Sequence, residues 1–199
     1  PLPHEVLIQV SHAGVCRTDL SVIYNKIQTP TPLIPGHEFS GRVTGTGSQI
    51  PIDSLGTRVT AHPLLPCLNC PTCQIQLNAC PDAQFLGIDR NGAFAEFICV
   101  PFNSTFVLPP EVSDLKGAYT EPVAASLAVL NAPIQPQEKG FIHGSNRIAQ
   151  LTSDILALRG FQDIIMAENI PEGTSFDFII ETQGDKSPFS KLVKALRPK

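Results

Sequence analysis

Side chains that can bind zinc are the first sign of chemistry in this chain of 199 residues. Cys16 and the neighbouring pair His37 and Glu38 lie near its start, and Glu121 follows much later. Zinc in an enzyme takes about three protein ligands from Cys, His and carboxylate groups and keeps one position for water or substrate. A single Cys or His is usually a core residue, but this combination predicts a catalytic zinc site.

The segments around these residues resemble the zinc-containing medium-chain alcohol and polyol dehydrogenases of the sorbitol type. The run from 36 to 43, GHEFSGRV, is similar to the zinc signature of that family. The run from 121 to 125, EPVAA, is similar to the sorbitol-dehydrogenase branch, in which a Glu occupies the late metal position. The resemblance extends over nearly the whole chain and implies an oxidoreductase.

The same resemblance implies a catalytic zinc ion held by Cys16, His37 and Glu121. Glu38 would be either an alternative ligand or an electrostatic neighbour of the metal. A zinc ion at this position would polarise the substrate oxygen and lower the pKa of an alcohol. A nicotinamide cofactor, NAD or NADP, would accept the hydride. The expected substrate is therefore a small alcohol or polyol, or the corresponding carbonyl compound.

Three residues directly after Cys16 receive further roles from the resemblance. Thr18 matches a hydroxyl that relays the alcohol proton towards solvent. Asp19 matches a carboxylate that orients a zinc-bound His, as such ligands require. Arg17 matches an arginine that pairs with the cofactor pyrophosphate, a partnership that suits the guanidinium group. The alternative for Arg17 is a surface cation without such a role.

A second cluster of cysteines indicates metal binding independently. Cys67, Cys70, Cys73 and Cys80 supply four thiols within one Pro-rich segment. Four thiolates close a tetrahedral zinc shell and leave no open position, so this site would be structural. The alternative is a pair of disulfides, which requires an oxidising compartment. The printed chain begins at Pro1 without a signal peptide, which favours zinc; the family has one more residue before the last Cys.

Composition and charge exclude several classes of partner. The formal net charge is −4, with acidic and basic residues interspersed, so no basic surface for nucleic acid or membrane is expected. The uncharged run from 59 to 81 is interrupted by prolines and cysteines and cannot be a membrane-spanning helix. We expect a cytoplasmic enzyme that binds a small-molecule substrate and forms a homodimer or homotetramer.

The pattern of apolar residues along the chain changes near residue 120. Before it, short β-branched or alternating runs such as 5–10, 41–45 and 94–98 are separated by Pro and Gly, which is typical of a β-barrel-like domain. We expect residues 1–120 to form the zinc-binding catalytic domain, which in the resembling family is GroES-like. Residues 121–199 would form a partial Rossmann-type, doubly wound α/β domain that binds the dinucleotide.

Helix and strand patterns follow one another in this second region. Residues 121–131 predict a helix with Thr120 as its N-cap, and Gly140–His143 reads as an apolar strand. Apolar residues then recur on one face of a helix that Gly160 can end. The runs 163–167 and 176–181 read as two further buried strands.

The turn after the first of these strands is where a dinucleotide should bind, because its pyrophosphate needs a glycine-rich turn and a helix N-terminus. The motif GSNRIA keeps only the first glycine, Gly144; Asn146 and Ala149 replace the other two. Ala is accepted at the third position, and Asn tolerates a positive φ, so the turn can form. The side chain of Asn146 could crowd the phosphates, and Arg147 could offset this with its charge.

Glu168 lies where the family places the carboxylate that binds the adenosine ribose, which would favour NAD over NADP. The alternative is a solvated residue after a strand. The family pattern also predicts missing segments at both ends of the chain and between Glu168 and Phe176. Three hypotheses remain: a zinc-dependent dehydrogenase, a relative that keeps both zinc sites but binds no dinucleotide, and a zinc-stabilised structural module.

Overall fold

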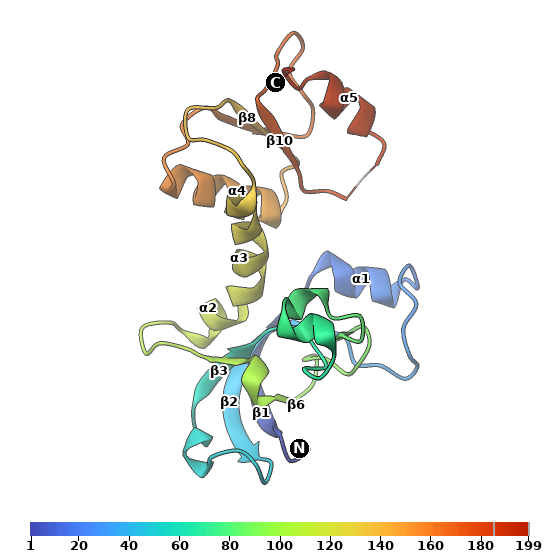
Figure 1. The fold of residues 1–199 in the computed structure, drawn as a ribbon, viewed down its shortest axis with the longest axis vertical. Coiled ribbons are helices and arrows are strands. Elements are labelled where there is room, and N and C mark those ends of the chain that lie inside the picture. Colours follow the sequence, from blue (N-terminus) through green and yellow to red (C-terminus); the bar gives the residue numbers. More distant parts are fainter. Residues whose placement is uncertain (185, 199) are drawn as a thin grey trace. The chain divides into compact units, whose positions relative to one another are not determined.

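The structure is a computed structural model that describes residues 1–184 and 186–198. It consists of two compact units, Pro1–Glu121 and Pro122–Lys199 (Figure 1). Each unit contains its own sheet and its own hydrophobic core. The first unit carries the metal-binding motifs and the second carries the glycine turn.

The first unit is organised around an antiparallel sheet of five strands in the order β6-β1-β2-β3-β7. The strands are β1 Glu5–Gly14, β2 Glu38–Thr46, β3 Arg58–Ala61, β6 Phe97–Pro101 and β7 Thr105–Val107. The long pairing of β1 with β2 shifts register twice, between Leu7 and Ile8 and between Val10 and His12. Such irregularities bend a strand and increase its twist, as curvature of the sheet requires.

Alternation along these strands builds the first core. Val6 and Ile8 of β1 are fully buried, and they pack with Phe39 and Val43 of β2. Burying aliphatic and aromatic side chains of this size stabilises the fold by roughly 1.5–3 kcal/mol each. The period-two pattern of the run 5–10 therefore predicted the strand correctly, although β1 continues to Gly14.

Shorter elements connect the strands of the first unit. They are the two-stranded sheet of β4 Leu64–Leu65 and β5 Gln84–Phe85, the 3₁₀ turns Ile52–Ser54, Pro71–Gln74, Leu77–Ala79 and Phe102–Ser104, and the helices α1 Arg17–Ile23 and α2 Asp114–Ala118. The β-like texture of the sequence did not predict α1 or α2. Both are short and depend on caps: Ser113 accepts the amide of Lys116 at the start of α2, and Asp19 accepts the amide of Cys16 at the start of α1.

The expected helix over 121–131 differs from the observed one at both ends. Helix α3 spans Thr120–Leu127, and its last stretch, Ala128–Asn131, continues as a 3₁₀ turn. Thr120 is therefore not an N-cap but a helical residue, because Tyr119, at the end of α2, immediately precedes it. Pro122 lies within the first turn of α3, where its missing N–H leaves no hydrogen bond unmade.

The second unit is a parallel three-stranded sheet in the order β10-β8-β9, with β8 Gly140–His143 in the centre, β9 Ile164–Ala167 and β10 Phe178–Glu181. All four residues of β8 are buried. Neighbouring side chains of β8 enter different cores: Ile142 packs with Leu156 of helix α4, Arg147–Leu158, and Phe141 packs with Leu192 of helix α5, Phe189–Lys194. A sheet with a core and a helix on each of its two faces is the doubly wound arrangement that the sequence predicted.

A short connection without a helix joins β9 to β10. Ile170 of this connection packs against the cluster that contains Phe141 and Phe176. The family pattern predicted a missing segment between Glu168 and Phe176, and the connection there is short. The loop thus fills part of a sheet face that a crossover helix covers in a complete doubly wound domain.

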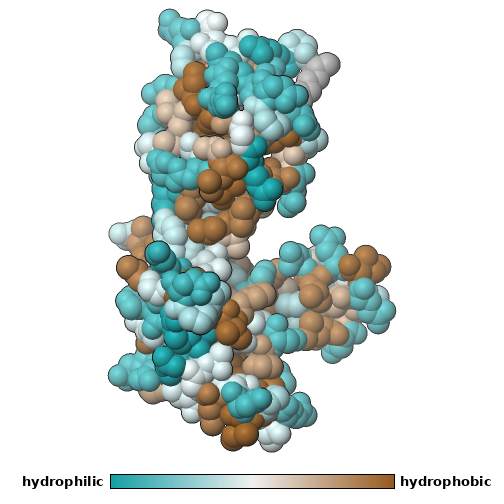
Figure 2. All heavy atoms as spheres, turned by 90° about the vertical axis from the view of Figure 1, so that its left-hand side faces the viewer, coloured by the Kyte–Doolittle hydropathy of each residue, from teal (hydrophilic) through white to brown (hydrophobic). Residues whose placement is uncertain are grey.

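The surface mixes polar and apolar side chains. Hydrophobic patches interrupt the hydrophilic surface on the face shown in Figure 2. Among the residues that the structure describes, no helix has the length and apolar character needed to cross a membrane.

Candidate metal centres and nucleotide site

Cys16, His37 and Glu38 form a group of possible metal ligands in the first unit. One donor atom of each lies within 4.8 Å of the others. The long β1–β2 ladder brings them together, because its last pair, Gly14 with Glu38, places the end of β1 beside the start of β2. Cys16 lies two residues after Gly14 and is the N-cap of α1.

Asp19 ties the two segments of this group together. Its carboxylate is buried, with 1% exposure. One oxygen accepts the amide of Cys16 at 2.7 Å, and the other accepts the amide of Gly36 at 3.1 Å. The same oxygen lies 3.3 Å from Nδ1 of His37. Asp19 therefore orients both the loop that carries the thiol and the imidazole ring, as a carboxylate behind a metal-binding His does.

His37 is 3% exposed, and its ring lies edge-on to the ring of Phe85, with 5.3 Å between the ring centroids. Nδ1 is close enough to Asp19 for an ion pair, but it forms no hydrogen bond of acceptable geometry with any described residue. The contact is therefore electrostatic. With Nδ1 facing Asp19, Nε2 is the ring nitrogen left to bind a metal.

Charges at this group favour the metal-binding form of the thiol. The contact with His37 is the main cause that lowers the pKa of Cys16. Burial acts to lower the pKa of His37, but the contacts with Asp19 and Cys16 outweigh it and raise that pKa to about 10. Thiolate is the form that binds metals. A thiolate, an imidazole and a carboxylate are the donors of catalytic zinc sites, so these residues fit zinc, whose binding would displace the proton from Nε2 of His37.

Two glycines allow the chain to approach this group closely. Gly36 has φ +101°, and a Cβ on it would lie 2.6 Å from the ring of Phe94 and 2.9 Å from its backbone nitrogen. A Cβ on Gly14 would lie 2.5 Å from an oxygen of Glu38. Gly36 is thus needed for the local backbone conformation, and Gly14 leaves space for the Glu38 carboxylate.

The other residues predicted for this site lie at different distances from the ligand group. The hydroxyl of Thr18 lies 3.8 Å from the sulfur of Cys16. Arg17 begins α1 and is exposed. Glu121 lies in the first turn of α3 and is half-buried, but it does not belong to the described group whose donor atoms lie within 4.8 Å of one another. Its role as a zinc ligand stays a prediction, as do the roles of Thr18 and Arg17.

The structure brings all four cysteines of the second cluster together. Four of the six sulfur–sulfur distances among Cys67, Cys70, Cys73 and Cys80 are 3.5 to 3.9 Å, and all four sulfurs lie within 4.8 Å of one another. Four sulfurs around one zinc at about 2.3 Å would be roughly 3.8 Å apart in an ideal tetrahedron. None of these described cysteines forms a disulfide. The shorter interval before Cys80 therefore does not displace its sulfur, and the thiols fit a closed structural zinc site.

The glycine turn of the second unit has a different geometry from the expected one. Gly144 has φ +120°, whereas Asn146 has φ −77° and ψ 175°, ordinary extended values. The tolerance of Asn for positive φ is therefore not what permits the turn. Asn146 is the N-cap of α4: its side chain accepts the amide of Ala149 at 3.0 Å and donates to the carbonyl and hydroxyl oxygens of Thr182 at 3.0 and 3.1 Å. Asn146 thus bonds to the helix N-terminus and to the end of β10.

Glu168 lies between two side chains that the sequence analysis did not identify. Ser145 donates a hydrogen bond to its Oε1, and Gln183 donates one to its Oε2. The bond from Ser145, followed by that from Gln183, holds the pKa of Glu168 below its usual value. Ser145 follows Gly144 in the turn, and this position in the motif could have identified it from the sequence. Gln183 follows a different strand, and nothing in the sequence indicated that it contacts Glu168.

His143 and Glu181 also escaped the sequence analysis. They end the neighbouring strands β8 and β10 as a register pair, and Nδ1 of His143 lies 3.2 Å from Glu181. His143 is 6% exposed. The positions were recognisable as strand ends, where ligands of open α/β sheets bind, but their pairing depended on strand order.

Comparison with known proteins supports this arrangement. Residues 2–110 match the family model of the alcohol dehydrogenase GroES-like domain. Galactitol 1-phosphate 5-dehydrogenase of Escherichia coli K12 is 36% identical over 124 residues, which cover 62% of this chain and 36% of that protein. The zinc-type alcohol dehydrogenase-like protein YdjJ of the same organism is 30% identical over 182 residues, 84% of this chain and 51% of that protein.

A solved structure extends the similarity to the fold of both units. A zinc-binding dehydrogenase from Sinorhizobium meliloti 1021 bound to NADP matches with a TM-score of 0.90 and 26% identity, covering 99% of this chain and 68% of that chain. The chain spans about half of the length of YdjJ and about a third of the length of the galactitol phosphate enzyme. With its zinc signature, its clustered donors and its matched domain, the chain belongs to the zinc-type alcohol dehydrogenase family with a GroES-like domain.

Proposed function

We propose that this protein is a zinc-dependent oxidoreductase that transfers a hydride between an alcohol or polyol, or the corresponding carbonyl compound, and NAD or NADP. The observation that carries the proposal is the buried group of Cys16, His37 and Glu38, with Asp19 behind the imidazole. A purely structural zinc module would not require an open donor set beside the closed four-cysteine cluster.

The residues of the chain divide the work at the first site. Cys16, His37 and either Glu121 or Glu38 would hold zinc, which when bound supplies a Lewis acid that lowers the pKa of an alcohol. Asp19 keeps the imidazole oriented. Thr18, whose hydroxyl is near the thiol, would accept the substrate proton and pass it towards solvent.

The second unit would bind the dinucleotide at the carboxyl ends of its parallel strands. Gly144 gives the turn, and Arg147, in the first turn of α4, would face the pyrophosphate. Glu168 would accept the hydroxyls of the adenosine ribose. Two structures with similar folds were solved with NADP and NADH, one from Sinorhizobium meliloti and one from Escherichia coli, which supports a nicotinamide cofactor.

The substrate class rests on similarity alone. Galactitol 1-phosphate 5-dehydrogenase and the D-altritol 5-dehydrogenase of Agrobacterium fabrum, 30% identical over 177 residues, are named for polyols. We therefore place an alcohol or polyol in the first site.

Metal content and dinucleotide binding test the proposal together. Elemental analysis of the purified protein should find zinc at the Cys16 site, and titration with NADH and NADPH at low salt should raise nicotinamide fluorescence. A Cys16→Ser variant should lose zinc from this site and keep the fluorescence response, because the dinucleotide binds elsewhere. Zinc absent from the first site in the unaltered protein would contradict the proposal.

A second function is favoured by one specific observation. The side chain of Asn146 occupies an amide of the α4 N-terminus and bonds to Thr182, where a pyrophosphate would otherwise have access. The protein would then be a zinc-binding relative with a non-catalytic, binding or regulatory role. Two occupied zinc sites without any response to NADH or NADPH at low salt would support this alternative.

A further inference from the structure

We propose that Gln183 and Ser145 are positioning residues that hold Glu168 so that the site accepts an adenosine ribose with a free 2′-hydroxyl and rejects one with a 2′-phosphate. This inference rests on the proposed dinucleotide function and deepens it. It assigns the choice between NAD and NADP to residues on three different strand ends.

The three residues come from separate parts of the sheet. Ser145 lies in the turn after β8, Glu168 follows β9 directly, and Gln183 lies just beyond β10. Each carboxylate oxygen of Glu168 has its own donor: the Ser145 hydroxyl bonds to Oε1 and the Gln183 amide bonds to Oε2. Two donors on opposite oxygens fix the plane of a carboxylate, which a single donor would leave free to rotate.

The backbone at Gln183 is held in place by hydrogen bonds to Glu181 and to strand β8. The backbone amide of Gln183 donates to Oε1 of Glu181 at 2.7 Å. The backbone amide of Gly184 donates to Oε2 of Glu181 at 2.8 Å. The preceding amide, of Thr182, donates to the carbonyl of His143 in β8 at 3.2 Å. The segment after β10 is therefore attached to the central strand, and Gln183 meets Glu168 from a fixed position.

A carboxylate fixed in this way selects between the two ribose forms. An ionised carboxylate has about four acceptor sites and no donor, so roughly two sites remain for hydroxyl donors of a ribose diol. Hydrogen bonds from Ser145 and Gln183 lower the pKa of Glu168 and so further favour its ionised form. A 2′-phosphate offers negatively charged acceptors at the same place, and both repulsion and the loss of the hydroxyl donor oppose its binding.

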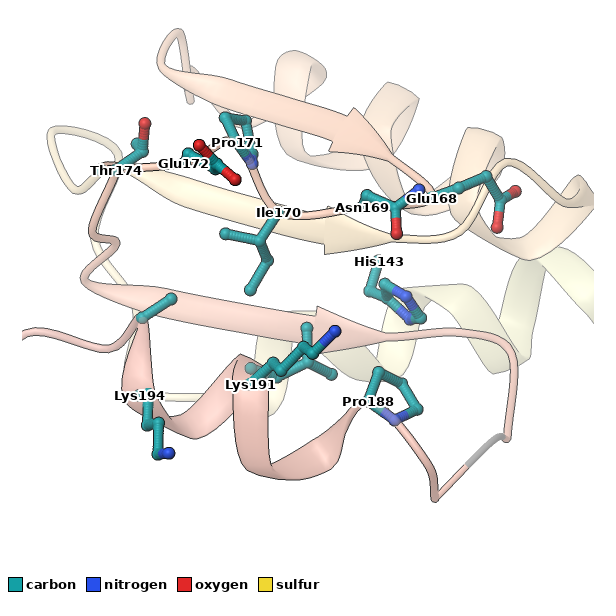
Figure 3. A pocket seen from close by; sticks show the side chains of 13 residues that line it. His143, Glu168, Asn169, Ile170, Pro171, Glu172, Thr174, Pro188, Lys191 and Lys194 are labelled. Atoms are coloured by element: carbon teal, nitrogen blue, oxygen red, sulfur yellow. The ribbon is translucent and has the colours of Figure 1, made fainter.

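The two lysines of helix α5 do not face this charge. Lys191 and Lys194 of α5 line the same cavity of about 540 Å³ as Glu168 and His143. Figure 3 shows the Glu168 carboxylate turned away from both lysines. If Gln183 were absent, Glu168 would lose one of its two donors and could leave the position in which it meets the ribose. Discrimination would then fall although Glu168 is still present.

Two small probes isolate the adenosine end of the cofactor from the rest of the site. AMP carries a free 2′-hydroxyl, and adenosine 2′,5′-bisphosphate carries the 2′-phosphate. Their dissociation constants would be measured by isothermal titration with the purified, zinc-loaded protein and with Gln183→Ala, Ser145→Ala, Glu168→Ala and the double variant Gln183→Ala/Glu168→Ala. Gln150→Ala is the matched control, because this exposed glutamine bonds to a carboxylate of its own helix, Asp154, at 2.9 Å.

The unaltered protein and Gln150→Ala should prefer AMP by about tenfold or more, which corresponds to one unfavourable charge contact. Gln183→Ala and Glu168→Ala should each reduce the preference to about threefold or less, and Ser145→Ala should reduce it in the same direction. In the Glu168→Ala background, Gln183→Ala should have no further effect, because a positioning residue acts only through its partner.

Different failures have different meanings. Binding of both probes with equal affinity, or a preference that Gln183→Ala leaves unchanged, would overturn the positioning role and leave the proposed function intact. An additive effect of Gln183→Ala in the Glu168→Ala background would also overturn it. If neither probe bound and NADH did not bind either, the proposed dinucleotide function would fail and this inference with it.

Discussion

At the scale of single residues, Asn146 shows how one substitution in a motif changes the ligands available to a helix N-terminus. A glycine at this position leaves the amides of the first turn open to a pyrophosphate. Here the carboxamide accepts the amide of Ala149 and donates to Thr182. The side chain therefore supplies internally the acceptor that a phosphate oxygen would supply.

Asn146→Gly should tighten dinucleotide binding by about tenfold, because one competing hydrogen-bonding group is removed. The thermal midpoint should fall slightly, since glycine costs only about a few tenths of a kcal/mol at an N-cap while the bonds to Thr182 are lost. Fluorescence titration with NADH at two salt concentrations measures both affinity and its dependence on charge. Asn146→Ser, which retains a capping oxygen, is the control, and an unchanged NADH affinity in Asn146→Gly would show that Asn146 does not compete with the cofactor.

Glu121 and Glu38 offer the same chemistry to the first metal site, and only one of them needs to bind zinc. We expect Glu121→Ala to lose most zinc from this site while the four-cysteine site stays occupied. Glu38→Ala should lose less zinc if Glu38 is an electrostatic neighbour. Elemental analysis of both variants decides between them. Full occupancy in Glu121→Ala together with loss in Glu38→Ala would assign the ligand to Glu38, which is buried beside Cys16 and His37.

At the scale of elements, strand β1 is attached to the rest of the first unit by an ion pair at its start. Glu5 is 3% exposed, accepts the amide of Leu2 at 3.0 Å and lies 2.9 Å from Arg90. Burial raises the pKa of Glu5, but the bonds from Leu2 and Arg90 outweigh it, and the net pKa is lowered.

Because the folded pKa of Glu5 lies below the unfolded value of about 4.3, its contribution is present above that value and disappears as pH falls through the folded pKa. Glu5→Gln should lower the free energy of unfolding at pH 7 by about 1–2 kcal/mol. The difference from the unaltered protein should shrink below about pH 4. Urea unfolding at pH 7 and at acidic pH measures it, with exposed Glu111→Gln as the control. A difference that grows at acidic pH would contradict the assignment.

At the scale of the whole molecule, two groups of possible metal ligands with different designs lie in one unit. The group around Cys16 has an open donor set, whereas the cysteine cluster from Cys67 to Cys80 can enclose an ion completely. An open site exchanges its ion more readily than a closed one, and a structural zinc contributes directly to folding.

The protein should therefore bind two zinc ions per chain and release them in two steps. Mild chelation should remove the ion at Cys16 and abolish any dehydrogenase activity while changing the thermal midpoint little. Stronger chelation should remove the second ion and lower the midpoint by several degrees or more. Elemental analysis paired with calorimetry follows both steps. Simultaneous loss of both ions, or a stoichiometry of one, would refute the two-site design.

Several features of the protein were determined by its sequence alone. The zinc signature around His37 and the spacing of the four cysteines identify the metal chemistry, because the ligands are few and chemically specific. The apolar run of β8 and the helical repeat of α4 predicted the doubly wound unit, because local periodicity follows directly from backbone geometry. The strand β1 was recognised for the same reason.

Other features were decided only by the tertiary structure. The two carboxylate oxygens of Asp19 bind the amides of Cys16 and Gly36, which are far apart in the sequence. Gln183 reaches Glu168 only because β10 and β9 flank the same central strand. Thr120 is a helical residue and not the expected N-cap, because α2 ends directly before it. Periodicity and motif spacing describe neighbours along the chain, whereas these contacts depend on strand order and on which atoms folding brings within hydrogen-bonding distance.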